Sequence, residues 1–300
     1  MLGVTLVVQL EWRAWPFELL TNFPVQFLAG SALVALAAAL TRARIAFVLV
    51  AIALVVNATI VGRTMARSSQ PTDPRAGSVT FGHLNAQTRP IDVPALGAYL
   101  QELRPAAFVV LDPVQSDVPG LTHAAPGYRV AMTGSHNGGR PEFVRAVVLS
   151  RVPVTDPQHP ADPRFGRSAV EFTLTDETPI DIVVFGTDSP TTPARARERD
   201  RSLDAAARWS RAHGARRIVM GDFNATPWSP SFGRLLQHGQ LRDSLDGFGI
   251  QPSWPESNVL IRIPIDHALL GPALGARDRG TGPSFGSQHR SLHVTVATAR

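Results

Sequence analysis

The sequence predicts an apolar pair of helices followed by one α/β domain made of packed sheets with helices beside them. Three observations support this prediction. Two uncharged apolar runs occupy residues 23–40 and 45–62, a polar segment with two prolines follows at residues 68–76, and strand-like segments outnumber helix-like ones from residue 77 onward. Many strands with few helices between them favour sheets flanked by helices over a doubly wound parallel sheet.

Each apolar run has the length of a membrane-crossing helix. A helix needs roughly 17 to 25 residues to cross a bilayer core, and neither run has the polar stripe of an amphipathic helix. We therefore predict a membrane anchor, residues 1–67, with two transmembrane helices in contact with the lipid bilayer. Residues 1–10 are too short to span alone but could end a third span. Trp12, Trp15 and Phe17 suit an interfacial aromatic belt.

The turn between the two runs bears on the orientation. Its sequence, TRAR at residues 41–44, carries two arginines and favours the cytoplasmic side under the positive-inside rule. Arg63 and Arg67, after the second run, favour the opposite orientation. We expect a multi-pass protein of the cell membrane with its soluble domain outside the cytoplasm. All 29 basic residues are arginine, which together with abundant Ala, Gly and Pro indicates a GC-rich, bacterial coding sequence and hence the bacterial inner membrane.

Charge and cysteine content exclude several function classes. Of the 29 arginines and 24 acidic residues, 6 and 3 precede Gly77, which leaves 23 − 21 = +2 for the rest of the chain. This balance gives no concentrated basic surface for a nucleic-acid duplex. The absence of cysteine excludes disulfides, thiolate metal sites and cysteine nucleophiles.

Residues 77–300 are long enough for one domain, which a linker at residues 68–76 joins to the anchor. Strand character occurs at residues 78–86, 107–112, 128–133, 143–150, 169–175, 180–186, 217–222, 265–270 and 292–298. Helices are predicted at residues 93–103, from apolar spacing, and at residues 194–212, after Pro193. Residues two apart on a helix do not share a face, so we expect a solvated surface for Arg195, Arg197, Arg199 and Arg201.

The most informative segment is RIVMGDFNATPWSP, residues 217–230. An apolar strand there ends at Gly221, and Asp222 and Asn224 follow at a strand terminus, where loops build sites. The carboxylate could activate a water molecule or bind a metal, and the amide could hydrogen-bond a phosphate oxygen. Taken alone, Gly-Asp-x-Asn is a simple turn as often as a site.

Two further segments change those odds. PIDHALL places Asp266 at the start of an apolar strand, and GSQHRSLHVTV places His289 in a polar loop before the last strand. A histidine oriented by a carboxylate can hydrogen-bond or protonate a phosphoryl group. Each residue alone is more often a surface or capping residue. Without metal-ligand spacing or a P-loop pattern, structural roles are expected for His83, His123, His159 and His293 and for the glycine-rich loop at residues 135–143, which carries His136 and Arg140.

The order of these motifs resembles the endonuclease/exonuclease/phosphatase family of metal-dependent phosphoesterases. GDFNATP is the most specific element, IDHALL and GSQHRSLHV occupy the expected places after it, and LSRVPV at residues 149–154 resembles the family's Ser-Arg-x-Pro segment. The resemblance implies a four-layer αββα sandwich with the site at one edge of its two sheets. It also implies hydrolysis of a phosphoester substrate, of a class that the sequence does not specify, with Mg²⁺ or Mn²⁺ as cofactor.

The family's residues carry over to five positions. Asn85 in HLNAQ matches the first-strand asparagine at the metal, and Asp222 matches the carboxylate that positions or deprotonates water. Asn224 matches the residue that steadies the phosphate. Asp266 matches the acid that orients the catalytic histidine, which is His289.

Three positions depart from the family pattern. Pro113 stands where the metal-binding glutamate is expected, and strand alternation points the neighbouring Asp112 to the opposite face unless Pro113 introduces a bulge. Asp188 replaces a histidine that stabilises the phosphoryl oxyanion. Gln288 replaces the aspartate before the catalytic histidine, which removes a charge that supports the metal.

Two alternatives follow from these departures. The first is a hydrolase whose remodelled site recruits Asp112 and Asp188 as replacement metal carboxylates. The second is a catalytically inactive, membrane-tethered binding or scaffold module. Substitution at three separated motifs favours impaired catalysis, because Mg²⁺ takes few protein ligands and one loss weakens its binding. We expect Asp188 to face the site and Asp112 to face away from it.

Overall fold

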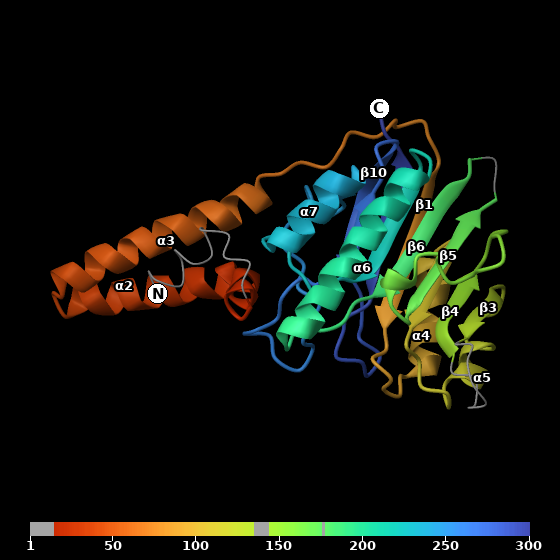
Figure 1. Ribbon diagram of the computed structural model, residues 1–300, viewed down its shortest axis with the longest axis horizontal. Helices are drawn as coiled ribbons and strands as arrows, with labels where there is room; N and C mark the ends of the chain where they lie inside the picture. The colour runs from red at the N-terminus through yellow and green to blue at the C-terminus, as the bar shows by residue number, and fades with distance from the viewer. Residues whose placement is uncertain (1–14, 135–143, 176–177) are drawn as a thin grey trace.

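The computed structural model describes residues 15–134, 144–175 and 178–300; the predictions for residues 1–10 and 135–143 lie outside them. Two sheets form the body of the molecule (Figure 1). The first has the order β10 (Leu274–Thr281), β11 (Leu292–Thr298), β1 (Ser78–Asn85), β2 (Ala107–Leu111), β4 (Val144–Ser150) and β3 (Arg129–Gly134). The second has the order β5 (Ala169–Leu174), β6 (Ile180–Gly186), β7 (Arg217–Asp222), β9 (Asp266–Leu270) and β8 (Arg242–Asp243).

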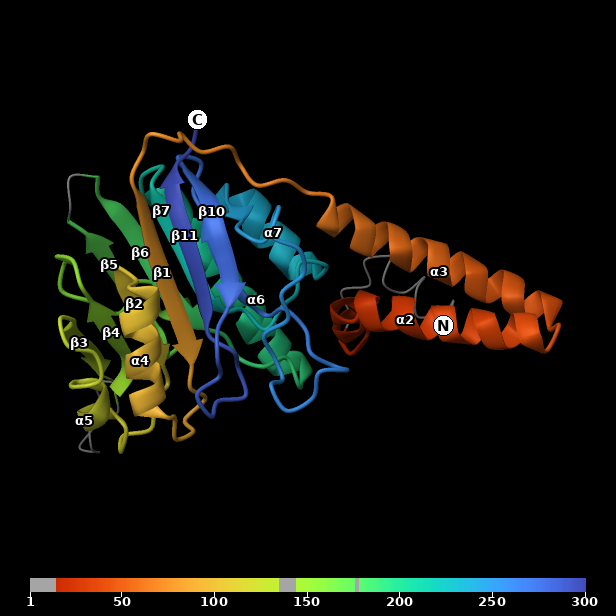
Figure 2. The same cartoon turned by 180° about the vertical axis from the view of Figure 1, so that it is seen from behind.

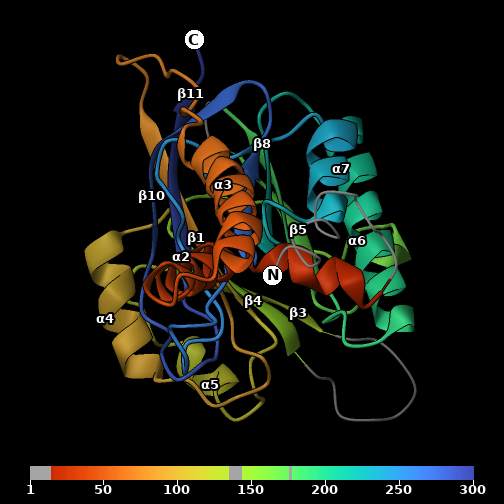
Figure 3. The same ribbon diagram turned by 90° about the vertical axis from the view of Figure 1, so that its left-hand side faces the viewer.

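Helices cover the outer face of each sheet and complete four layers (Figure 3). The first sheet carries α4 (Val93–Leu103) and the short α5 (Val118–Leu121), and the second carries α6 (Pro193–Ala212) and α7 (Pro230–Gly239). A 3₁₀ turn, η2 (Pro163–Phe165), packs beside α6. Among the described strands, parallel pairing is confined to β1 with β2 and to β6 with β7. The predicted αββα sandwich is confirmed, and a doubly wound parallel sheet is excluded.

Strand alternation decides which residues face the space between the sheets. Phe81 on β1, Met220 on β7 and Ala268 on β9 belong to the central apolar core. Their neighbours Leu84, Val219 and Leu269 instead pack against the outer helices. Because side chains two apart share a face, a polar residue that ends one of these strands in the inner register lies at the edge of the central layer.

The N-terminal helices form a pair that projects from the body (Figures 1 and 2). The helices α2 (Pro24–Leu40) and α3 (Arg44–Met65) lie side by side, and a 3₁₀ turn, η1 (Phe17–Asn22), lies at their base. Mostly small or polar residues, together with Val50 and Val61, are buried along the pair, whereas apolar side chains such as Leu33, Leu36 and Val55 point outward. Within the described residues, α3 alone is long and apolar enough to cross a membrane, and α2 is shorter.

The segment predicted as a linker is partly attached to the domain. Thr72 pairs with Ala299, and the side chain of Arg277 on β10 contacts Thr72 and Asp73. The start of residues 68–76 leads from α3, so the chain reaches the first strand along the edge of the sheet that carries β10.

Two further expectations differ from the structure. The strand β10 was not predicted, because a bulge between Ala276 and Asp278 interrupts the alternation of an already charged segment. The α6 surface is not wholly solvated: Arg199 is buried, and its guanidinium forms an ion pair with Glu18 of η1. Glu18 lies 181 residues away in the sequence, so local spacing gives no sign of this partner.

Candidate active site

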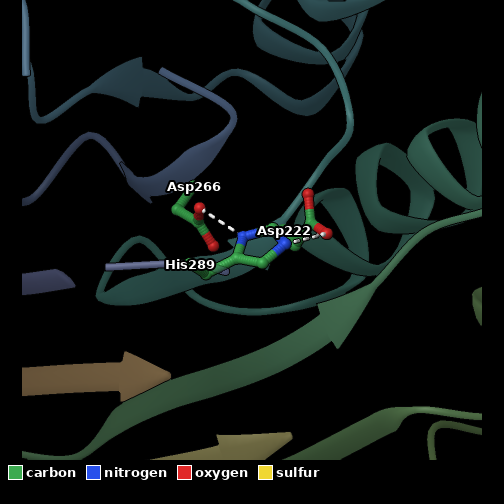
Figure 4. A group of neighbouring side chains, drawn as sticks. All are labelled: Asp222, Asp266 and His289. Carbon is green, nitrogen blue, oxygen red and sulfur yellow. Dashed lines mark hydrogen bonds and ion pairs between the residues drawn. The ribbon is translucent and has the colours of Figure 1, made fainter. Parts of the chain in front are cut away.

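Four chain segments meet at one edge of the central layer. Asn85 ends β1, Asp222 ends β7 and Asp266 begins β9, each in the inner register. His289 lies in the loop that leads into β11. These segments come from both sheets, so the fold itself brings these side chains together. Figure 4 shows three of them, Asp222, Asp266 and His289.

His289 bridges two aspartates. Its Nδ1 lies 2.8 Å from Asp266 Oδ2, and its Nε2 lies 3.6 Å from Asp222 Oδ2. All three side chains are buried. The backbone N–H groups of Ile265 and Asp266 donate to Ser253 Oγ, which fixes the start of β9 and hence the carboxylate that faces the imidazole.

Asp222 accepts hydrogen bonds on both carboxylate oxygens. Asn85 Nδ2 and Asn224 Nδ2 donate to Oδ2 at 3.0 and 3.1 Å, and the backbone N–H of Asn224 donates to Oδ1 at 2.9 Å. Asn224 adopts a left-handed conformation with φ 46°, which turns its amide back toward Asp222. Gly221 is required before this turn, because its φ is 139° and a Cβ there would lie 1.9 Å from the carbonyl oxygen of Phe185.

Burial and mutual attraction set the charges of this group. Burial raises the pKa of Asp222 to about 7, against the opposing effect of His289. Burial alone would lower the pKa of His289, but Asp266 and Asp222 together raise it to about 9. Burial would likewise raise the pKa of Asp266, yet His289 holds it below its usual range. At neutral pH an imidazolium is therefore paired with an ionised Asp266, while Asp222 is near its midpoint.

Two residues that the motifs did not single out also contact this group. Gln87 places its amide nitrogen 2.8 Å from His289 Nε2, to which it can donate when that nitrogen carries no proton. His83, for which a structural role was expected, is buried with Nε2 3.9 Å from Asp266 Oδ1. Its distance of two residues from Asn85 on one strand was the available signal, because both side chains then share the inner face.

Asp112 is held elsewhere. Ser168 Oγ donates to Asp112 Oδ1 at 2.6 Å, and Arg145 lies 3.8 Å from the same oxygen. Ser168 immediately precedes β5, which is two strands from β7 in the second sheet. Two strand spacings amount to about 10 Å, so this attachment keeps the carboxylate away from Asp222. A left-handed φ of 46° at Asp112 breaks the strand alternation there, and Pro113 is buried beside it.

The other two departing positions lie in loops beside the cluster. Asp188 is exposed in the loop after β6, directly after Thr187, whose carbonyl oxygen accepts from Asn224 Nδ2 at 3.0 Å, and it makes no hydrogen bond or ion pair with the residues that the structure describes. Gln288 turns toward a neighbouring loop, where its Oε1 accepts from Ser257 Oγ at 2.9 Å. Neither side chain replaces the missing glutamate.

The chemistry of the cluster is compatible with a divalent cation. One ligand atom from each of Asp222, Asp266 and His289 lies within 4.8 Å of the others, the one such group in the described part of the chain. Two carboxylates and an imidazole are common ligands of divalent metals. His289 can bind a metal only after its Nε2 loses its proton, so metal binding and the imidazolium are alternative states of the same side chain.

The sequence matches the model of the Endonuclease/Exonuclease/phosphatase family over residues 71–289. The match spans more than half of the chain and includes each of the strand ends and loops that form the cluster. The chain belongs to this family, as the GDFN, IDHALL and SQH motifs indicated. No curated protein matches the sequence.

Solved structures share the fold at low identity. An endonuclease/exonuclease/phosphatase family protein from Bacteroides thetaiotaomicron is 14% identical with a TM-score of 0.59, covering 74% of this chain and 98% of its own. A mannosyl-6-phosphatase from the same organism is 15% identical with a TM-score of 0.58, covering 73% and 99%. The D. rerio TDP2 complexed with single-strand DNA product is 14% identical with a TM-score of 0.58, covering 73% and 99%. These neighbours include a phosphatase and a DNA-bound protein, so they establish the fold and leave the substrate open.

Proposed function

We propose that the protein is a membrane-anchored phosphoester hydrolase whose active site is the cluster of Asp222, Asp266 and His289. The observation that carries this proposal is the buried contact of His289 with Asp266 at 2.8 Å and with Asp222 at 3.6 Å, in which the two carboxylates raise the pKa of His289 and burial raises the pKa of Asp222. Buried groups with strongly shifted pKa values are typical of catalytic sites. A module that only binds a partner has no need to bury three ionisable groups in contact.

Each residue has a distinct role in the proposed reaction. Asp266 orients the imidazole and stabilises its charge, and His289 Nε2–H donates a hydrogen bond to a phosphoryl oxygen. Asp222, near its midpoint, accepts the proton of the attacking water, while Asn85 and Asn224 hold its carboxylate in place. A Mg²⁺ or Mn²⁺ ion held by the carboxylates of Asp222 and Asp266 would supply positive charge to the phosphoryl group, and His289 Nε2–H would then stay free to donate.

Membrane attachment is the second part of the proposal. The helix α3 has 22 residues and spans about 33 Å, the thickness of a bilayer core. Small residues pack between α2 and α3 while long apolar ones face outward, which is the arrangement of transmembrane helix pairs. We propose that both helices cross the membrane and, from the arginines at residues 41–44, that the domain lies outside the cytoplasm.

A catalytically inactive binding module is the second candidate. Three features favour it: Pro113 in place of the glutamate, Asp112 tied to Ser168, and Gln288 turned toward Ser257. The metal would then have no further carboxylate from the described residues beyond Asp222 and Asp266. The two candidates differ in whether the cluster turns over a substrate.

The test is hydrolysis of water-soluble model esters by the full chain reconstituted in lipid nanodiscs. Initial rates are measured on bis-p-nitrophenyl phosphate and p-nitrophenyl phosphate with Mg²⁺ or Mn²⁺. We expect metal-dependent turnover that Asp222→Asn and His289→Gln each lower by at least about 100-fold, the range of general acid–base contributions. Matched controls are Asp156→Asn and His238→Gln, which change exposed residues of the same types.

Three outcomes are informative. Loss of turnover in the two site variants, with both controls unchanged, supports the hydrolase. Turnover that all four variants retain would place catalysis elsewhere. A folded wild-type chain without turnover on either ester with either metal would contradict the proposal and favour the inactive module.

A further inference from the structure

A single loop of the domain exposes three consecutive large apolar side chains. Val259, Leu260 and Ile261 are 72%, 78% and 47% exposed. Every other large hydrophobic residue that is exposed in the described part of the chain lies at or before Met65, in the N-terminal helices or at their base. We call residues 259–261 the apolar tip.

The loop that carries the apolar tip has a defined shape. Arg262 closes its base by donating to the carbonyl oxygen of Pro255 and by pairing with Glu256 at 3.2 Å. The side chain of Asn258 accepts a hydrogen bond from the backbone N–H of Leu260 at 3.0 Å. These contacts hold the backbone on both sides of the apolar tip, whose side chains remain exposed. The exposure therefore belongs to a loop with defined internal contacts.

The apolar tip lies beside the base of the helix pair. Gln26, in the first turn of α2, donates to the carbonyl oxygen of Arg262 at 3.2 Å. Figures 1 and 2 show the blue loop before β9 reaching from the body toward the start of α2 in both views. Trp15 and Phe17, both partly exposed aromatic residues, lie at the same base. The exposed apolar surface of the helices thus continues onto this loop.

We infer that the apolar tip inserts into the interfacial layer of the bilayer that α2 and α3 cross. This inference rests on the membrane attachment proposed above. A lipid surface is the occupant that fits, because three adjacent apolar side chains continue the lipid-facing surface of α2 at the depth where aromatic residues gather. Insertion would give the domain a second contact with the membrane and fix its tilt.

Insertion would also place the candidate active site at the bilayer surface. The same loop contacts the segment before His289: the backbone N–H of Glu256 donates to the carbonyl oxygen of Gln288 at 2.8 Å, and Ser257 donates to its side chain. A phosphoester carried by a lipid headgroup would reach the cluster from this surface. If the hydrolase proposal holds, lipid-borne phosphoesters are therefore the expected substrate class.

The absence of native cysteine allows a direct test with single labels. Leu260→Cys, Ile52→Cys on the outer face of α3 and Asp156→Cys on the exposed surface are each labelled with an environment-sensitive fluorophore in the full chain. The labelled chains are reconstituted in phosphatidylcholine–phosphatidylglycerol nanodiscs with and without lipids that carry a nitroxide on the acyl chain. We expect blue-shifted emission and nitroxide quenching at positions 260 and 52, and neither at position 156.

The pattern of quenching separates the inference from the proposals beneath it. Quenching at position 52 without quenching at position 260 would overturn insertion while leaving membrane attachment intact. A blue shift at position 260 without nitroxide quenching would also overturn it, since a protein surface would then cover the apolar tip. Absence of quenching at position 52 would overturn membrane attachment itself. None of these readouts depends on catalysis.

Discussion

At the scale of single residues, the buried carboxylates of the site are stabilised by hydrogen-bond donors that face them. Asp222 receives three hydrogen bonds from Asn85 and Asn224, and Asp266 is paired with His289. Burying an ionised carboxylate without such partners is strongly unfavourable. The two asparagines therefore contribute to the site by keeping Asp222 available in the charged form, a role that does not require them to touch a substrate.

Asp246 differs from Asp266, because its surroundings favour the protonated form of the carboxyl group. Burial and then repulsion from Asp243 raise its pKa to about 6, although Arg67 lies 3.9 Å away. Because the folded-state pKa exceeds the unfolded value, ionisation of Asp246 destabilises the folded state as pH rises from about 4 to about 6. Above pH 6 the full penalty is present. At pH 3 both states are protonated and the penalty vanishes.

We predict that Asp246→Asn stabilises the full chain at pH 7.5 by about 1 kcal/mol, a value reduced from the full shift because the side chain is partly exposed. The gain should diminish as the pH is lowered toward 4. Urea unfolding of the detergent-solubilised protein at several pH values measures it. Asp156→Asn, an exposed counterpart, should show no such trend. A gain that did not depend on pH would refute the electrostatic explanation.

At the scale of elements, the N-terminal turn η1 supports the loop that follows β7. Asn22 Oδ1 accepts from Ser229 Oγ at 2.8 Å and from Thr226 Oγ1 at 3.1 Å. On the other side of this loop, Arg199 donates to the carbonyl oxygen of Asn224 and pairs with Glu18. The base of the N-terminal helix pair is thus part of the structure that positions Asn224.

Removal of one of these contacts should weaken the loop. We predict that Asn22→Ala destabilises the full chain by about 1–3 kcal/mol, because two buried hydroxyl groups lose their common acceptor. Thermal unfolding in detergent, followed by tryptophan fluorescence, would show the change. Gln101→Ala, which removes an exposed side-chain amide on α4, is the control and should have little effect. Equal stability of the wild type and Asn22→Ala would contradict this role of η1.

The elements that the sequence predicted well are those with strong local patterns. The helix α4 was predicted at its observed bounds because apolar residues repeat along one face, and the structure adds that the side chain of Asp92 caps its first turn. The strand β7 likewise agrees with its prediction. By contrast, β10 contains a bulge, and its charged side chains find partners on distant segments. The alternation of apolar and polar residues alone therefore could not predict this strand.

The same distinction applies to the candidate site. Asp222, Asn224, Asp266 and His289 lie in short motifs at strand ends, and the fold brings them together. Gln87 and Arg199 could not be predicted, because their partners lie 202 and 181 residues away in the sequence. The expectation that Asp188 faces the site relied on strand register, and it stays a prediction because β6 ends at Gly186, before this residue.

At the scale of the whole molecule, specific hydrogen bonds join the apolar helix pair to the two-sheet domain. Besides η1, Trp228 Nε1 donates to Thr64 Oγ1 at the end of α3, at 2.9 Å. These contacts orient the domain relative to the helices (Figure 2). We expect the domain to keep one orientation at the membrane surface, with the apolar tip directed at the lipid.

Membrane integration of the full chain can be tested independently of activity. We predict that the protein stays in the membrane pellet after alkaline carbonate extraction, because transferring the apolar faces of α2 and α3 into water is strongly unfavourable. A peripheral protein of the same membranes, released by the carbonate, serves as the control. Release of the intact protein would contradict membrane integration.

The most direct measurement compares one phosphoester headgroup presented in two ways to the full chain in nanodiscs with Mn²⁺. The headgroup is supplied either on a lipid in the nanodisc or as the free, water-soluble ester, and released phosphate or alcohol is followed over time. We predict faster hydrolysis of the lipid-borne ester, a loss of at least about 100-fold in Asp222→Asn, and a selective loss of the lipid-borne reaction when Val259, Leu260 and Ile261 are all changed to Ser. Equal rates for the wild type and Asp222→Asn on both forms of the ester would contradict the account.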